Sequence, residues 1–188
     1  ESALHNIKSR ILEKWGKLDG VIANVGNGKS VPDAIASSQH WESVWNVNFD
    51  TALYAARVFL EMLTKSQGNL LFISSITGIE AFGAPVDYST AKTAVIAFAQ
   101  NLARKVAPDV RVNVIAPGNI NFPGGEWDKK YKDKPMEVES MLHDKVPMQR
   151  FGSPQEIADA AAFICSQRAS FITGTVLRID GGQTVSLL

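Results

Sequence analysis

Residues 69–118 decide the fold, and they read NLLFISSITGIEAFGAPVDYSTAKTAVIAFAQNLARKVAPDVRVNVIAPG. The apolar run 70–73 ends in two serines and predicts a buried strand. An alanine-rich stretch, 86–107, follows Pro85 and predicts a helix. A second apolar run, 110–116, predicts another strand. A strand, a helix and a strand in this order predict two parallel strands joined by a crossover helix.

The same alternation extends in both directions along the chain. Helices are expected over 1–17, 38–64 and 154–166, strands over 18–25 and 175–180, and an irregular polar segment over 119–150. We expect the strand at 18–25 to be buried like the others. The pattern predicts a single α/β domain over 1–188, with a Rossmann-like, doubly wound parallel sheet between two layers of helices.

Composition excludes several classes of protein. The chain holds 19 Lys and Arg against 19 Asp and Glu, so it lacks the basic surplus of nucleic-acid-binding proteins. One cysteine, Cys165, excludes an internal disulfide and a multi-cysteine metal site, and the three histidines have no metal-ligand spacing. No apolar run reaches the ~20 residues that would span a membrane. We therefore expect a soluble protein of a reducing compartment, the cytoplasm.

Chemistry-bearing residues follow the predicted strands. In open parallel sheets, ligands bind at the carboxyl ends of the strands. The polar, glycine and proline residues at these places are Asn24 and Gly26, Ser74 and Ser75, and Pro117 and Gly118.

Tyr88 and Lys92 lie one turn apart near the start of the predicted helix, so their side chains share a face. An ammonium beside a tyrosine stabilises the phenolate and lowers the pKa of the hydroxyl. Such a tyrosine exchanges a proton with a substrate oxygen near neutral pH, and a nearby serine orients that oxygen.

Several motifs in order along the chain resemble one enzyme family. They are Asn24-Val25-Gly26, Asn48, Ile73-Ser74-Ser75, Tyr88 to Lys92 (YSTAK), 113–118 (NVIAPG), 150–158 (RFGSPQEIA), 172–174 (ITG) and 180–182 (DGG). Over essentially its whole length the chain resembles the compact branch of the short-chain dehydrogenase/reductases.

The resemblance implies a catalytic set of Asn48, Ser75, Tyr88 and Lys92. Tyr88 would be the general acid/base, and Ser75 rather than Ser74 would orient the substrate oxygen. Lys92 would hold the nicotinamide ribose and lower the pKa of Tyr88, while Asn48 would support a proton relay.

The resemblance also implies a bound NAD or NADP, and the sequence does not show which of the two is used. The cofactor-binding residues would be Asn24, Gly26, Tyr88, Lys92, Pro117, Gly118 and Ile120. Residues 119–150 would form a substrate lid, and Phe122 and Trp127 in this lid would contact substrate together with Ser75. Tyr131, Met136 and Met141 are further apolar candidates for that pocket.

The family's Gly-rich phosphate-binding turn has no counterpart in these residues. We expect the N-terminal part of the family's domain, ~60–80 residues on the scale of two βα units, to be missing from this sequence. The 188 residues alone are then expected to bind cofactor weakly and turn over little.

The implied activity is the NAD(P)-dependent interconversion of a secondary alcohol and a ketone. The sequence shows neither the substrate nor the direction of the reaction. An epimerase or dehydratase that uses the same tyrosine and lysine, or a non-catalytic scaffold, are the alternatives. The family also implies a dimer or tetramer formed through the helices at 38–64 and 86–107 and the last strand.

Overall fold

A computed structural model describes residues 1–29, 31 and 33–186. The helices are α1 (Ser2–Trp15), α2 (Ser38–Trp45), α3 (Thr51–Ser66), α4 (Val86–Val106), α5 (Glu126–Asp133), α6 (Pro135–Lys145) and α7 (Pro154–Cys165). The strands are β1 (Gly20–Ala23), β2 (Asn69–Ile73), β3 (Arg111–Pro117) and β4 (Val176–Ile179). A π-helical turn (Asn46–Asp50) joins α2 to α3, and short 3₁₀ turns lie at Ile76–Gly78 and Gln167–Ala169.

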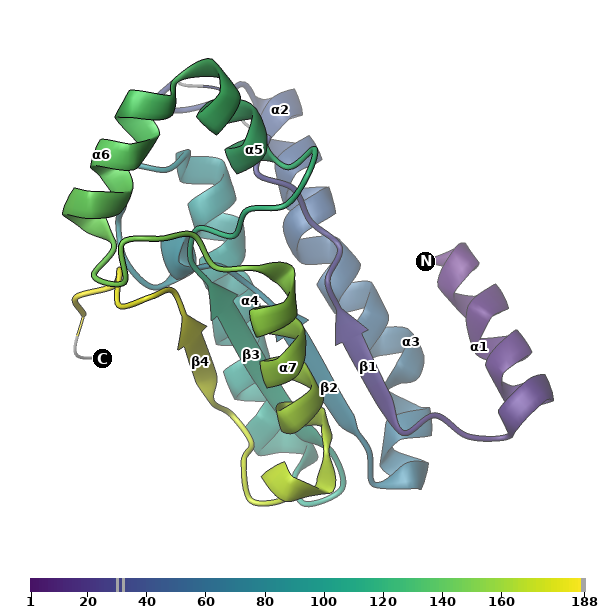
Figure 1. The fold of residues 1–188 in the computed structure, drawn as a ribbon. Coiled ribbons are helices and arrows are strands. Elements are labelled where there is room, and N and C mark those ends of the chain that lie inside the picture. The colour runs from purple at the N-terminus through teal and green to yellow at the C-terminus, as the bar shows by residue number, and fades with distance from the viewer. Residues whose placement is uncertain (30, 32, 187–188) are drawn as a thin grey trace.

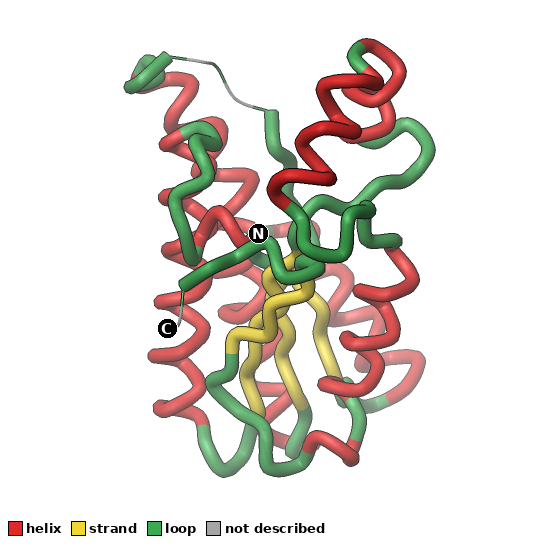
Figure 2. Tube along the Cα trace, turned by 60° about the vertical axis from the view of Figure 1, so that its left-hand side comes forward, coloured by secondary structure: helices red, strands yellow, loops and turns green. Residues whose placement is uncertain are grey.

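The four strands form one parallel sheet in the order β1-β2-β3-β4 (Figure 1). Alternate residues of the central strands pack into two hydrophobic cores, one on each face of the sheet. Leu70 and Phe72 pack with α3 and α4, whereas Leu71 packs with α7 on the other face. Figure 2 shows the strands between helices on both sides. The α/β fold with three layers is confirmed.

The connections between neighbouring strands do not all have the same hand. The α3 and α4 connections pass over one face of the sheet, and the α7 connection passes over the other, while each step moves to the next strand in the same direction (Figure 1). The last connection therefore has the opposite hand to the first two, although about 98% of such crossovers are right-handed. This last connection also carries α5 and α6, which lie above the carboxyl ends of the strands (Figure 1).

Strand β1 is less buried than we expected. Val21 and Ala23 pack on the α3 side of the sheet, but Ile22 points to the other face and is 52% exposed. Strand β1 lies at an edge of the four-stranded sheet, and α7 covers the residues of β2 and β3 on that other face. An apolar strand sequence predicts burial on both faces only when helices cover both.

The expectation of an irregular segment over 119–150 is wrong, because two helices form there. Helix α5 has ion pairs at helical spacing, Glu126 with Lys129 at 2.9 Å and Asp128 with Lys132 at 2.8 Å. Helix α6 begins at Pro135, a favoured first position. Its apolar side forms a small core of Val138, Leu142 and Val146, packed against Met141 and Phe151. Local charge pairs and a short apolar stripe thus suffice for helix formation.

The other predicted elements form close to their expected positions. Helix α1 ends at Gly16, whose φ of +70° is a left-handed conformation that glycine adopts without strain. Helix α4 follows Pro85, and the expected helix over 38–64 forms as α2, the π-helical turn and α3. None of the helices among the described residues is long and apolar enough to cross a membrane.

Helix α7 begins with a capping box, which yields a test of the fold. The Ser153 Oγ accepts the Glu156 N–H at 3.3 Å, and the Glu156 carboxylate accepts the Ser153 N–H at 2.8 Å. We expect Ser153→Ala to lower the free energy of unfolding by about 1 kcal/mol, because one backbone donor of α7 loses its acceptor. Urea unfolding measures the loss. The exposed Ser170→Ala serves as control, and an equal loss there would contradict the capping role.

Candidate active site

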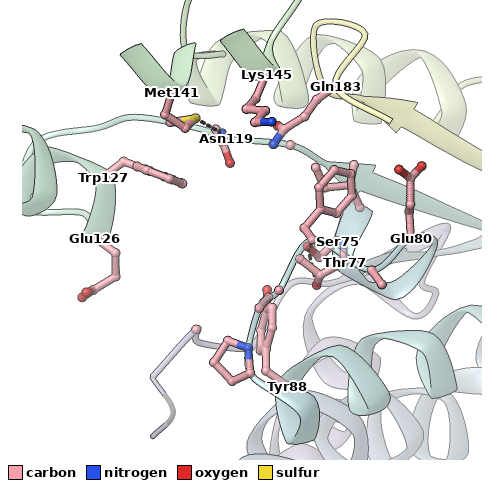
Figure 3. A pocket seen from close by; sticks show the side chains of 18 of the residues that line it. Ser75, Thr77, Glu80, Tyr88, Asn119, Glu126, Trp127, Met141, Lys145 and Gln183 are labelled. Carbon is pink, nitrogen blue, oxygen red and sulfur yellow. Dashed lines mark hydrogen bonds between the residues drawn. The ribbon is translucent and has the colours of Figure 1, made fainter. Parts of the chain in front are cut away.

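A cavity of about 1280 Å³ opens at the carboxyl ends of the strands. Its walls come from the loop after β1, the segment between β2 and α4, the residues after β3, helices α5 and α6, and the C-terminal segment after β4. Ser75 and Tyr88 lie at one side of it, and Asn119, Lys145 and Gln183 at another (Figure 3).

Ser75 and Tyr88 both lie at the wall of this cavity. Ser75 follows β2 and caps a 3₁₀ turn, where its Oγ accepts the Thr77 N–H at 3.2 Å and the Thr77 hydroxyl at 3.0 Å. Tyr88 lies in the first turn of α4, where its hydroxyl is close enough to Ser75 for the serine to influence its pKa. The two hydroxyls therefore face one point in the cavity, where one substrate oxygen can contact both.

Lys92 lies behind Tyr88 and is 5% exposed. Its Nζ donates to the Ile73 carbonyl at 3.1 Å and lies 5.9 Å from the centre of the Tyr88 ring. Burial lowers the pKa of the Lys92 ammonium to about 8, because the charged form loses its hydration.

The expectation that Lys92 lowers the pKa of Tyr88 is not met in this structure. Burial raises the pKa of the Tyr88 hydroxyl, and the hydrogen bond with Ser75 opposes this only in part. Ser74 has a different task from Ser75, because its Oγ donates to the Lys92 carbonyl at 2.8 Å and joins the end of β2 to α4.

Asn48 lies in the π-helical turn and is almost completely buried, at 1% exposure. In this turn the Thr51 N–H reaches the Asn46 carbonyl, five residues back, in place of the usual four. The Asn48 Nδ2 donates to the Val44 carbonyl at 3.0 Å, and its Oδ1 accepts the Asn27 N–H at 3.1 Å. The widened turn thus points an amide at the loop after β1.

Gly26, in the loop after β1, packs against the buried side chains of Asn48 and Lys92. A Cβ at Gly26 would lie 2.8 Å from the Asn48 Oδ1 and 3.0 Å from the Lys92 Nζ. The glycine therefore lets the backbone reach Asn48 and Lys92 together, and no larger residue fits without displacing one of them. Asn24 lies just beyond β1 and is exposed.

The residues after β3 divide between two cavities. Gly118 lines the large cavity and packs so closely on Asp180 that a Cβ would lie 2.7 Å from the Asp180 Cα. Pro117 is the last residue of β3, and Ile120 forms a bridge with Gly152 beside a smaller cavity.

The expectation for the lid residues is only partly met. Trp127 and Met141 line the cavity. Phe122 does not line it, because its ring lies 3.0 Å from the Cβ position of Gly125 and its side chain is half exposed. Tyr131 and Met136 also lie outside the residues that line the cavity, since the helices of this segment turn them to solvent.

Sequence reasoning missed residues that shape the site from a distance. Asp87 is buried, and its Oδ1 accepts the Tyr88 N–H at 2.7 Å, while its Oδ2 lies 3.6 Å from the His40 Nε2. Glu80 and Gln183 line the cavity. The sequence does show an acidic residue, Asp87, directly before Tyr88, and this could have marked it as a candidate. The positions of Glu80 and Gln183 at the cavity depend on tertiary structure, which the sequence pattern does not reveal.

Comparison with known proteins agrees with this geometry. The family model described as enoyl-(acyl carrier protein) reductase matches residues 1–184. The chain belongs to the short-chain dehydrogenase/reductase family. Two members of this oxidoreductase family have similar sequences. The peroxisomal 2,4-dienoyl-CoA reductase of Saccharomyces cerevisiae is 35% identical, over 95% of this chain and 60% of the relative. The 3-oxoacyl-[acyl-carrier-protein] reductase of Aquifex aeolicus is 33% identical, over 94% of this chain and 71% of the relative.

A solved structure in this family, levodione reductase, matches with a TM-score of 0.86 at 27% identity, over 96% of this chain and 72% of that one. The chain thus spans between 60% and 72% of the length of these relatives.

The close contact at Gly26 yields a test of the site in this short-chain dehydrogenase/reductase. We expect Gly26→Ala to lower the free energy of unfolding by about 1–3 kcal/mol, because the new methyl group forces Asn48 or Lys92 to move. Gly28→Ala in the same loop is the matched control, since no atom lies within 4 Å of its Cβ position. Urea unfolding compares the two, and equal losses would contradict the packing.

The buried Lys92 predicts a dependence of stability on pH. Below pH 8 the lysine is charged in both the folded and the unfolded chain, and the folded state carries a buried charge. Between pH 8 and 10.5 the unfolded chain binds more protons, so the Lys92 contribution to the free energy of unfolding rises with pH.

We expect the wild type to gain stability relative to Lys92→Met between pH 7 and pH 10, by up to about 3 kcal/mol. Denaturant unfolding of both proteins at the two pH values measures this. A difference that does not change with pH would show that the pKa of Lys92 is not lowered.

Proposed function

We propose that this protein is an NAD(P)-dependent oxidoreductase that interconverts a secondary alcohol and a ketone. The observation that carries the proposal is the placement of Ser75 and Tyr88 together at the wall of a large cavity, with the buried Lys92 ammonium behind them. Such a set gives a substrate oxygen two hydrogen-bonding partners and one proton source.

In the reductive direction, Ser75 holds the carbonyl oxygen in place and Tyr88 donates its phenolic proton to that oxygen. A bound nicotinamide cofactor supplies the hydride that the carbonyl carbon receives. Burial raises the pKa of Tyr88, so the hydroxyl is protonated near neutral pH, as a proton donor must be. In the oxidative direction the phenolate form of Tyr88 accepts the alcohol proton and becomes the neutral hydroxyl. Proton transfer of this kind contributes about 10²–10⁴ in rate.

The residues present fit the nicotinamide-ribose end of a dinucleotide cofactor. The Lys92 ammonium has three N–H donors, of which one is used on the Ile73 carbonyl, so donors remain for the hydroxyls of a ribose. Gly28 lines the cavity, and no atom lies within 4 Å of its Cβ position, so a flat ring can approach its backbone. Asn24, Gly26, Pro117 and Ile120 complete the binding set by resemblance. Asn48 is proposed to support the route by which Tyr88 regains its proton.

The names of the relatives favour the reductase over an epimerase, a dehydratase or a scaffold. A glucose 1-dehydrogenase of Bacillus subtilis, 33% identical over 98% of this chain and 71% of the relative, joins the two reductases already named. We also propose that the protein self-associates, as family members do, through the outer faces of α3 and α4 and the edge of β4. A cytoplasmic location stays a prediction.

Replacement of the Tyr88 hydroxyl tests the proposed function. We expect Tyr88→Phe in the complete protein to lower turnover of ketones with NADH or NADPH by 100-fold or more, because the proton donor is lost. Tyr54→Phe on α3 is the matched control and should retain its rate, since Tyr54 contacts Arg57 outside the cavity. Cofactor absorbance measures the rate, and circular dichroism checks the fold. Activity of Tyr88→Phe within a few-fold of wild type would exclude Tyr88 as the acid/base.

A further inference from the structure

The C-terminal segment after β4 connects two walls of the cavity. This segment comprises residues 180–186, and we call it the strap. Three of its residues line the cavity, namely Gly182, Gln183 and Val185. In Figure 3, Gln183 and Glu80 lie at the end of the cavity away from Trp127. The attachments of the strap therefore help to set the shape of this end.

Asp180 gives the strap a fixed turn. Its Oδ1 accepts the Gly182 N–H at 3.0 Å, and its Oδ2 accepts the Thr184 N–H at 2.8 Å and the Thr184 hydroxyl at 2.7 Å. The turn passes through Gly181 and Gly182 with φ of +65° and +84°, a left-handed conformation that glycine adopts without strain. The strap is thus a folded segment with a defined path.

The first half of the strap packs on the residues that follow α6. The Met148 N–H donates to the Gly181 carbonyl at 3.1 Å. Gly182 lies so close to Pro147 that a Cβ would be 3.2 Å from the proline Cγ. Because Pro147 itself lines the cavity, the strap begins at the wall that α6 leads into.

The second half of the strap is held by Glu80, which belongs to the segment between β2 and α4. One carboxylate oxygen, Oε2, accepts the N–H groups of Val185 and Ser186, each at 2.9 Å. Hydrogen bonds to a carboxylate are about twice as strong as those between neutral groups. The Arg178 Nη1 donates to the Ser186 carbonyl at 2.7 Å. Ser186 is therefore held through both of its backbone groups.

Glu80 is a firm attachment point because it belongs to a packed turn. The Ser75 carbonyl accepts the Gly78 N–H at 3.0 Å, and the Ile76 carbonyl accepts the Glu80 N–H at 3.0 Å. The turn packs tightly on α4, since a Cβ at Gly78 would lie 2.8 Å from the backbone carbonyl carbon of Lys92. The strap is thus fastened to the same turn that carries Ser75.

Val185 is the apolar residue that the strap brings to the cavity. It is 80% exposed, although its backbone is bound to Glu80. Further apolar lining residues lie near the attachment points, because Ala81 and Phe82 follow Glu80 directly and Pro147 contacts Gly182. Exposed apolar surface gains free energy when a ligand covers it and releases its water. A strap fixed in this place therefore offers an apolar contact to a ligand in the cavity.

We propose that the strap is a fixed wall of the substrate site, that Val185 contacts an apolar part of the substrate, and that Glu80 is the positioning residue that holds this wall in place. Substrate affinity then depends on a carboxylate that touches the strap in place of the substrate. The part that concerns substrate rests on the proposed function, whereas the attachment of the strap can be measured without any activity.

Hydrogen exchange in the complete protein tests the attachment. We expect Glu80→Ala to speed the exchange of the Val185 and Ser186 amides about 10-fold or more, because both lose their acceptor. Glu80→Gln keeps an oxygen at that place and should largely restore the slow exchange. Glu13→Ala, at an exposed glutamate on α1, is the matched control and should change neither amide. Equal exchange in wild type and Glu80→Ala would overturn the inference.

Reduction of two methyl ketones with NADH or NADPH tests the contact with substrate. We expect Glu80→Ala to lower the kcat/KM for 2-octanone relative to that for 2-butanone about 3- to 10-fold, through KM rather than kcat, because Val185 is no longer held against the longer chain. Val185→Ala should lower the ratio in the same direction, and Glu80→Gln should largely restore it. Since the ratio is measured within one protein sample, a fraction of misfolded protein does not change it.

The outcomes separate this inference from the proposed function. A ratio that stays at the wild-type value in Glu80→Ala and Val185→Ala would overturn the role of the strap in substrate binding and leave the proposed function standing. If neither ketone nor its alcohol reacts with either cofactor, the proposed function fails, and the contact of the strap with substrate fails with it.

Discussion

The burial of one positive charge constrains the rest of the site. The Lys92 ammonium is 5% exposed and hydrogen-bonds the Ile73 carbonyl at the end of β2. An ammonium out of water is stable only with acceptors around it, so several elements must converge on it. Ser74 binds the backbone of Lys92, and Gly26 brings the loop after β1 against the Nζ. The loop after β1, the end of β2 and helix α4 thus meet at a single side chain.

Much of this arrangement was predictable from the sequence. The strands and most helices follow from apolar periodicity, which is a local property. The pair of Tyr88 and Lys92 follows from helical spacing, and Ser75 from its place after a strand. The features that the sequence does not predict depend on contacts between residues that are distant in the chain. Ile22 is exposed because no helix among the described residues covers its face of β1. Phe122 is outside the cavity because its loop turns back on Gly125.

Two other differences have electrostatic and local causes. Residues 119–150 resemble a polar loop by composition, but ion pairs at helical spacing and a three-residue apolar core make helices of them. Lys92 was expected to lower the pKa of Tyr88, but its ammonium bonds a backbone carbonyl, and burial of the tyrosine raises that pKa. Spacing along a helix predicts which side chains share a face, but their burial and hydrogen-bond partners decide the pKa.

The π-helical turn at Asn46–Asp50 gives the helix before β2 a property that its composition does not reveal. A π-helical turn is equivalent to one extra residue within an α-helix, so every residue after it is rotated by about 100° relative to a regular helix. The face of α3 that packs on the sheet and the direction of Asn48 are therefore set by the number of residues between Ser38 and Ser66. In evolutionary terms, this stretch is far more tolerant of substitution than of insertion or deletion. A shortened relative could keep every apolar residue and still have no amide facing Gly26.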